Sequence, residues 1–125
     1  MSSLAFKLPW PPSSNMIWRT SRINGRQRTY LTMEAKSYRQ EVAYHYRTDC
    51  GLGDSRLAIV IYATPKDKRK RDLDNLLKSP IDALMACGVF TDDSQVDKLE
   101  IIRLPSDKED PHLWVQISEI EVDHV

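Results

Sequence analysis

The chain has 125 residues, of which 41% are hydrophobic and 29% are charged. This length suits a single domain spanning residues 1–125, and the composition excludes a disordered or fibrous protein. Eighteen basic residues balance eighteen acidic ones, so net charge alone favours no partner. The N-terminus lacks the long apolar segment typical of a secretory leader, and no apolar run approaches the ~20 residues of a membrane span, so we expect neither feature. Cys50 and Cys87 lack CxxC spacing, so we expect a cytoplasmic protein with reduced cysteines.

The chain begins with a short apolar segment and a basic segment. Residues 4–8 are mostly apolar and predict a strand, which the prolines that follow should end. Residues 19–28 contain four arginines, one glycine and no acid, and predict an exposed loop. Such a loop can simply be solvated, but guanidinium groups also match phosphate oxygens. The candidate nucleic-acid contacts here are Arg19, Arg22, Arg26 and Arg28.

A helix and a buried strand are predicted next. Thr32 is a candidate helix N-cap, and apolar residues then recur at helical spacing until the helix ends before Gly51. Residues 56–63 form a continuous β-branched and apolar run. Such a run is typical of a central strand that is buried on both faces.

The segment from Asp74 to Cys87 has helical spacing but contains Pro80. One possibility is a helix capped by Asp74 and kinked at the proline; the other is a helix that begins at Pro80 with Ser79 as its cap. We favour one interrupted helix, which Gly88 ends.

Two strands are predicted at the end of the chain, over residues 96–104 and 112–122. In the second, Leu113, Val115 and Ile117 alternate with polar or exposed positions, which indicates one buried face. A polar connection between prolines joins the two strands, so we expect them to pair antiparallel. The predicted order is β-α-β-α-β-β, an α+β two-layer domain with a mixed sheet covered by two helices.

The segment from Lys66 to Asp93 combines basic and acidic residues in an unusual way. Five of the six residues 66–71 are basic, and Asp72 and Asp74 follow at once, with a second acidic pair at residues 92–93. A polyanion is attracted by the first group and repelled by the second, unless a divalent cation intervenes. Carboxylates can bind Mg²⁺, which in turn binds phosphate oxygens. The pattern therefore predicts phosphodiester cleavage, with the basic candidates Lys66, Lys68, Arg69, Lys70 and Arg71 contacting the backbone.

The local geometry of the acidic residues leaves alternatives open. If the backbone is extended, Asp72 and Asp74 face the same way and meet one metal site, to which Asp92 or Asp93 adds a ligand. Lys78 lies four residues after Asp74. It is either one half of a surface ion pair or a cation that stabilises transition-state charge, and spacing alone favours the ion pair. Asp82 is expected to be a partner of Lys78 on the helix surface.

Several of these segments resemble the RusA family of Holliday-junction resolvases. The resemblance lies in residues 8–13, in the Arg-Asp-Leu-Asp-Asn-Leu run at 71–76, in Lys78, and in Gly88 followed by residues 91–96. It extends from the first strand to the end of the chain, and Pro80 departs from the family pattern. It implies a homodimeric, Mg²⁺-dependent endonuclease of phage or prophage origin that cuts four-way DNA junctions. The implied catalytic residues are Asp72, Asp74, Asp93 and Lys78, which reverses the preference for Lys78 as an ion-pair partner.

The sequence therefore predicts a structure-selective endonuclease that resolves Holliday junctions by paired symmetric nicks in DNA recombination and repair. Three aspartates are expected to bind Mg²⁺, for which Mn²⁺ should substitute. Each chain carries one acidic cluster and two nicks are needed, which favours a homodimer. One alternative is a nucleic-acid-binding module without catalysis, although carboxylates beside phosphates would only weaken its binding. Another is a nuclease of the same chemistry that acts on flaps or single strands.

Overall fold

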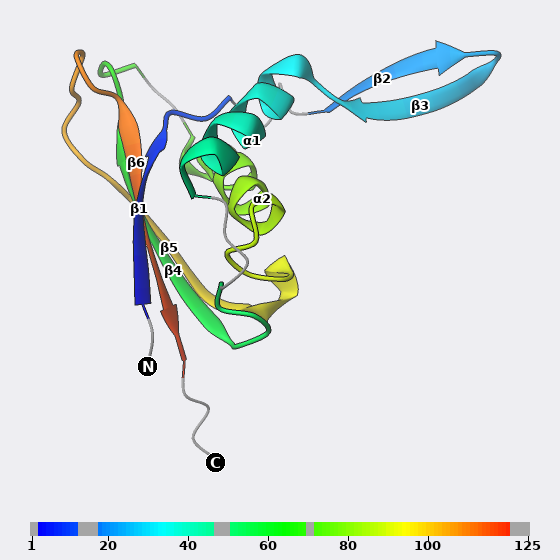
Figure 1. Cartoon of the computed structure of the whole chain (residues 1–125). Coiled ribbons are helices and arrows are strands. Elements are labelled where there is room, and N and C mark those ends of the chain that lie inside the picture. Colours follow the sequence, from blue (N-terminus) through cyan, green and yellow to red (C-terminus); the bar gives the residue numbers. More distant parts are fainter. Residues whose placement is uncertain (1–2, 13–17, 47–50, 70–71, 121–125) are drawn as a thin grey trace.

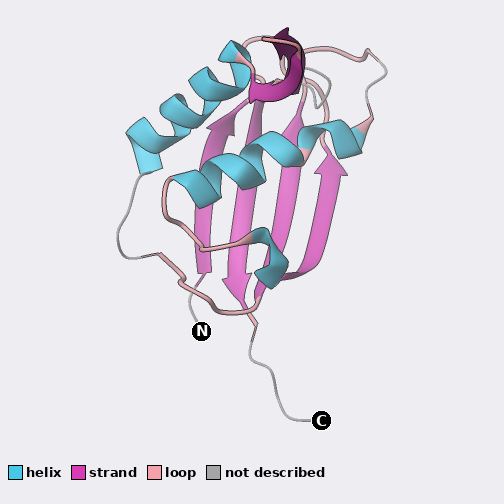
Figure 2. Cartoon of the chain, turned by 90° about the vertical axis from the view of Figure 1, so that its right-hand side faces the viewer, coloured by secondary structure: helices cyan, strands magenta, loops and turns pink. Residues whose placement is uncertain are grey.

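In the computed structural model, the protein is an α+β domain with a four-stranded mixed sheet and two helices (Figure 1). The structure describes residues 3–12, 18–46, 51–69 and 72–120. Both helices, α1 (Met33–Tyr46) and α2 (Lys78–Ala86), cover the same face of the sheet (Figure 2). Within the described residues, neither helix combines the length and the apolar character that crossing a bilayer requires.

The sheet has the strand order β1-β6-β4-β5. Its strands are β1 (Ser3–Pro9), β4 (Leu57–Thr64), β5 (Val96–Arg103) and β6 (His112–Glu119). β6 pairs antiparallel with both β1 and β4, whereas β5 pairs parallel with β4. The expected antiparallel pairing of the last two strands is therefore wrong. The residues explain why: Leu113, Val115 and Ile117 are fully buried, which suits a central strand, whereas β5 exposes most of its residues and lies at the edge.

The hydrophobic core lies between the sheet and the two helices. Alternate residues of β4 (Leu57, Ile59 and Ile61) are fully buried, together with Val42 of α1 and Leu84 of α2. Each such side chain stabilises the fold by roughly 1.5–3 kcal/mol relative to exposure. The intervening residues of β4 are only half-buried. The expectation of a strand buried on both faces is thus confirmed for one face and wrong for the other, because both helices lie on the same side.

The first helix is fixed at its start and along its length. The Thr32 hydroxyl oxygen accepts a hydrogen bond from the Ala35 amide at 3.3 Å, which confirms the predicted N-cap. The hydroxyl groups of Tyr38 and Tyr46 donate to the carbonyl oxygens of Pro9 and Lys7, each at 2.8 Å. Burial raises the pKa of the Tyr38 hydroxyl above its ordinary range, so this donor stays protonated. These bonds join α1 to β1.

The interrupted helix is confirmed, but the expected cap at Asp74 and kink at Pro80 are wrong. Asp74 lies inside the first helical turn, Asp72 precedes it, and the break falls at Leu77. A 3-10 turn, η2 (Leu73–Leu76), leads through Leu77 into α2, which begins two residues before Pro80. Pro80 therefore lies in the first turn, where backbone amides have no acceptor within the helix, and its missing N–H costs little. The alternative with Ser79 as N-cap is wrong, because Leu77 occupies that position.

The arginine-rich segment forms a β-hairpin instead of the expected loop. Strands β2 (Trp18–Ile23) and β3 (Arg26–Leu31) pair antiparallel and project away from the sheet and helices (Figure 1). The connecting residues Asn24 and Gly25 have φ angles of 53° and 76°. Two left-handed residues make the turn that matches strand twist, and Asn-Gly is a strong sequence signal for it. Arg22 and Arg26 are exposed; the predictions for the side chains of Arg19 and Arg28 lie outside what the structure describes.

Candidate active site

An open cavity of about 460 Å³ lies between α2 and the beginning of β5. Three of the predicted catalytic residues line it: Asp74 from η2, Lys78 from the first turn of α2, and Asp93 from the short 3-10 helix η3 (Asp93–Gln95). All three are exposed to solvent. The fold thus brings together carboxylates and an ammonium group from three separate elements.

Asp72 lies just before η2 and is not among the residues that line this cavity. Its backbone is extended, with φ −80° and ψ 129°, but Asp74 belongs to the 3-10 turn. Because such a turn has three residues per turn, alternate positions do not share a side. The backbone is therefore not extended from Asp72 to Asp74, and the condition under which the two carboxylates are expected to face the same way is not met. Across the described residues, no three His, Cys, Asp or Glu side chains are gathered closely enough to bind a metal ion.

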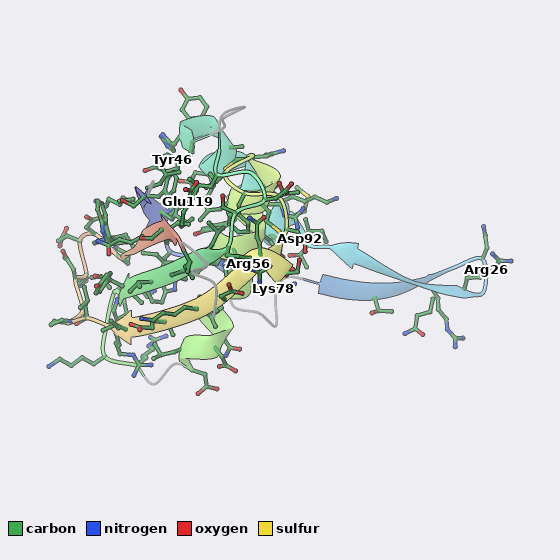
Figure 3. The ribbon with its side chains drawn as sticks, turned by 90° about the horizontal axis from the view of Figure 1, so that it is seen from below. Arg26, Tyr46, Arg56, Lys78, Asp92 and Glu119 are labelled. Carbon is green, nitrogen blue, oxygen red and sulfur yellow. The ribbon has the colours of Figure 1, made fainter. Side chains whose placement is uncertain are left out.

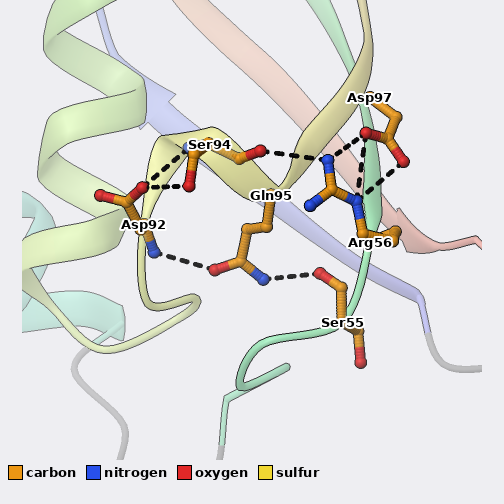
Figure 4. Close-up of polar contacts among 6 residues, drawn as sticks. All are labelled: Ser55, Arg56, Asp92, Ser94, Gln95 and Asp97. Carbon is orange, nitrogen blue, oxygen red and sulfur yellow. Dashed lines mark hydrogen bonds and ion pairs between the residues drawn. The ribbon is translucent and has the colours of Figure 1, made fainter.

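Gln95 fixes the turn that carries Asp93. Its side-chain oxygen accepts hydrogen bonds from the amides of Thr91 and Asp92, at 2.9 and 2.8 Å. Its side-chain nitrogen donates to the carbonyl oxygens of Gly53 and Ser55, at 2.9 and 2.6 Å (Figure 4 shows the bonds to Asp92 and Ser55). The amide is buried and makes four bonds, so it ties η3 firmly to the chain before β4.

The two neighbouring aspartates of this turn have different surroundings. The Asp92 carboxylate accepts hydrogen bonds from the amide, at 3.0 Å, and the hydroxyl of Ser94. These bonds lower the pKa of Asp92. Asp92 therefore caps η3, while Asp93 lines the cavity. Asp92 and Gln95 form a capping box, and their spacing is a readable signal from which this division of roles could have been predicted.

A bidentate ion pair lies beside the same turn. The Arg56 Nε atom lies 3.1 and 3.0 Å from the two carboxylate oxygens of Asp97, and a second guanidinium nitrogen contacts the same group (Figure 4). Arg56 also donates to the Ser94 carbonyl oxygen at 3.1 Å. Hydrogen bonds from Arg56 lower the pKa of Asp97. The pair links the start of β4 to the start of β5, and neither residue was predicted to belong to the site, because no motif connects them.

Arg56→Gln is expected to raise the pKa of Asp97 toward the ordinary aspartate value of about 3.9. Because folding lowers this pKa in the parent, the pair stabilises the fold at neutral pH, and this contribution is lost as pH falls below about 4. The variant should therefore melt at a lower temperature at pH 7, and the difference should shrink in acid. Carboxyl NMR titration combined with melting curves between pH 7 and 3 would check this.

The Asp110 carboxyl, which pairs with Lys7, is the internal control. An unchanged Asp97 titration would contradict the assignment.

Asp82 pairs with Lys78 as expected, but its side chain is buried, so the expected position on the helix surface is wrong. Its carboxylate oxygens lie 3.7 Å from Lys78 Nζ and 3.8 Å from an Arg39 guanidinium nitrogen. Its side chain is 9% exposed, and it lies where α2 packs against α1. A buried carboxylate must be paired, and these two cations supply the pairing. Asp82 thereby restricts the position of Lys78 at the cavity.

The predicted DNA contacts fall into two regions. Lys66, Lys68 and Arg69 are exposed in the connection between β4 and η2. Arg26 is at the tip of the hairpin, which projects from the rest of the molecule (Figure 3). Lys70 and Arg71 lie outside the described residues. The described candidates for DNA contact therefore lie in two separate regions, the connection before η2 and the hairpin, and none of them lines the acidic cavity.

Comparison with known proteins identifies the family. The model described as "Endodeoxyribonuclease RusA" matches residues 9–118. The chain belongs to the RusA family. Among the relatives of this chain, the crossover junction endodeoxyribonuclease RusA of Escherichia coli strain K12 is 37% identical over 111 residues. That match covers 86% of this chain and 88% of the relative.

Two phage proteins extend this relationship. The crossover junction endodeoxyribonuclease of Enterobacteria phage 82 is 37% identical over 111 residues, covering 86% of this chain and 88% of its own. That of Enterobacteria phage HK97 is 35% identical over 127 residues, covering 97% of this chain and 98% of its own. The resemblance to RusA that the sequence suggested is confirmed, and all four predicted catalytic residues lie inside the span that the family model matches.

Proposed function

We propose that this RusA-family chain is a structure-selective endonuclease that resolves four-way DNA junctions by paired symmetric nicks during DNA recombination and repair. The relatives are named crossover junction endodeoxyribonucleases and align with most of the chain. The observation that carries the proposal is the meeting of Asp74, Lys78 and Asp93 at one open cavity. A module that only binds DNA would gain nothing from these carboxylates, because each repels phosphate.

The donor groups at the cavity fit Mg²⁺ in kind, because that ion prefers carboxylate and water oxygens. We propose Asp72, Asp74 and Asp93 as its ligands, with Mn²⁺ as a substitute. Asp74 and Asp93 line the cavity in the described arrangement; Asp72 lies two residues before Asp74 and is included through the family pattern. When bound, the ion would supply a water of lowered pKa and neutralise phosphoryl charge. Lys78 would place its ammonium beside the phosphate oxygens as negative charge develops on them.

We further propose that two chains act together. Resolving a four-way junction takes two nicks related by symmetry, and the described part of one chain presents one acidic cavity with Asp74, Lys78 and Asp93. Two sites therefore need two chains, and a two-fold homodimer is the commonest solution. The basic residues that precede η2 and those on the hairpin would guide the arms of the junction toward the two cavities.

Metal dependence and substrate choice can be tested in one assay. Four-way junction, flap, linear duplex and single-stranded DNA are each incubated with excess enzyme in Mg²⁺, Mn²⁺, Ca²⁺ or EDTA. We expect cutting of the junction in Mg²⁺ and Mn²⁺, and binding with little cutting in Ca²⁺, because calcium accepts more ligands at longer distances. Undiminished cutting in EDTA would contradict the metal mechanism. Faster cutting of flaps than of junctions would favour the related flap nuclease.

A further inference from the structure

A second and larger cavity, of about 600 Å³, is lined in part by Leu76 of η2. We infer that it binds one unstacked nucleotide of the DNA substrate, one or two positions from the phosphate that is cut. This inference rests on the proposed function and names a further substrate contact. Its size lies within the range of pockets that enclose small organic ligands, roughly 300–1,000 Å³.

The cavity is built where three strands end. Strands β1, β4 and β5 all run in the same direction, because β6 is antiparallel to both β1 and β4. The residues that follow their last residues, Trp10, Pro65 and Leu104, all line the cavity. Backbone bonds from Leu104 to Ala63 and from Asp107 to Pro65, both at 2.8 Å, fix the connections there. In open sheets, the carboxyl ends of parallel strands are a common place for ligands.

The chemistry of the lining matches a nucleotide. Trp10, Leu76 and Leu104 provide an aromatic and aliphatic floor on which a flat base can pack. Lys68, Arg69 and Arg103 provide cations at the same cavity, against the single carboxylate of Asp67. Arg69 lies 3.7 Å from that carboxylate. Three cations against one carboxylate leave the lining with a net positive charge. An apolar floor beside cations suits a base with its phosphate better than it suits an uncharged ligand or an acid alone.

The position of the cavity relates it to the proposed cleavage site. Leu76 lines this cavity and Asp74 lines the acidic one, and both belong to η2. With a rise of about 2.0 Å per residue, they are separated by about 4 Å along the helix axis. One strand of duplex DNA advances about 3.4 Å per nucleotide. The captured nucleotide would therefore be close to the cut phosphate, and a base can enter only if it leaves its stack, as at a branch point.

The chain offers a matched pair of variants. Leu104 lines the cavity and is 37% exposed, whereas Ile102 is 39% exposed and lines neither cavity. Binding to a junction is measured by fluorescence anisotropy in EDTA, with abasic sites placed in turn at each nucleotide flanking the branch point. We expect Leu104→Ala, which removes apolar surface on which the base would pack, to bind the intact junction about tenfold more weakly, and Ile102→Ala to bind like the parent protein. Melting curves confirm that both variants are folded.

The abasic series makes the result specific. At the captured position, loss of the base should weaken the parent protein by about the same factor, and Leu104→Ala should then add no further loss. The inference would be overturned if Leu104→Ala bound the intact junction as tightly as Ile102→Ala. It would also be overturned if Leu104→Ala weakened binding to every abasic junction by the same factor. If either of these results is obtained and the parent protein still binds and cuts junctions, the proposed function stands and only the nucleotide-binding role of this cavity is wrong. If the parent protein does not bind junctions, both fall.

Arg103→Gln provides a second readout that does not depend on the base. Loss of one contact to a single-stranded phosphate should lower the slope of log affinity against log salt by about 0.7. Lys108→Gln, in the exposed connection after β5, removes an equal charge away from both cavities and should change the slope less. Equal slopes for the two variants would also overturn the inference.

Discussion

Asp74→Asn is expected to abolish junction cleavage while junction binding stays the same or becomes tighter. The substitution keeps the size of the side chain but removes the charge that we propose binds the metal ion. A bound ion contributes several kcal/mol of transition-state stabilisation, and about 1.4 kcal/mol corresponds to tenfold in rate, so we expect a loss of about 10³-fold or more. The same change removes one repulsion toward phosphate, which explains why affinity should not fall.

Single-turnover cleavage and anisotropy on the same junction would measure the two effects separately. Asp107→Asn is the matched control, because Asp107 is exposed in the connection after β5 and does not line the cavity. Asp93→Asn should behave like Asp74→Asn. Asp72→Asn is the more informative companion, because Asp72 does not line the cavity in the described arrangement. If any of the three variants cuts at the parent rate, that residue is not a ligand.

Lys78→Ala is expected to slow the cleavage step by about 10²–10³-fold, the usual effect of losing one preorganised charge-stabilising group. The two interpretations of Lys78, as an ion-pair partner or as a cation that stabilises the transition state, predict different cleavage rates for this variant. As an ion-pair partner alone, Lys78 would affect stability by less than about 1 kcal/mol, since its side chain is half-exposed, and cutting would continue. Asp82 keeps its contact with Arg39 in the variant, so the fold should survive. Junction binding should fall little, because the other basic residues supply most of the attraction.

The rate is best measured with enzyme in excess, so that binding does not limit it. Lys98→Ala is the matched control, because it removes an exposed lysine whose ammonium lies 3.0 Å from Glu100 on β5. Lys78→Arg separates charge from shape: partial recovery would indicate electrostatics, and none would indicate a need for close positioning. A Lys78→Ala rate within twofold of the parent would rule out the catalytic role.

The periodic parts of the fold could be predicted from sequence, and the unpredicted parts follow from tertiary packing. Strand β6 buries every second residue from Leu113 to Ile117, as its alternating pattern indicated. The pairing of β5 with β4 could not be inferred from adjacency in the chain. It depends on α2 crossing the sheet and returning the chain beside β4, which leaves the other side of β4 to β6.

In the candidate site, too, some features could be predicted from sequence and others depend on tertiary packing. The motif predicted that Asp74, Lys78 and Asp93 lie near one another, and the structure brings them to one cavity. Spacing could not indicate that Asp82 is buried, because its burial comes from α1 packing on α2. It also could not indicate that the backbone changes from extended to 3-10 between Asp72 and Asp74. The hairpin, in contrast, could have been predicted from sequence, because Asn24-Gly25 is a strong signal for a two-residue hairpin turn. The four arginines are equally compatible with an exposed loop, and composition alone does not distinguish the two.

The position of β6 has a consequence for how the protein folds. The first strand pairs with the last, Ser3 opposite Ser118, and the last strand also completes the pairing of β4. During synthesis, β1 must therefore wait for almost the whole chain before its partner exists, and one side of β4 stays open for as long. Contacts so distant in sequence slow folding, and open strand edges invite pairing with other chains. A ribosome that stops before residue 112 would release a chain with both edges unpaired, so chaperones should matter most for incomplete chains of this protein.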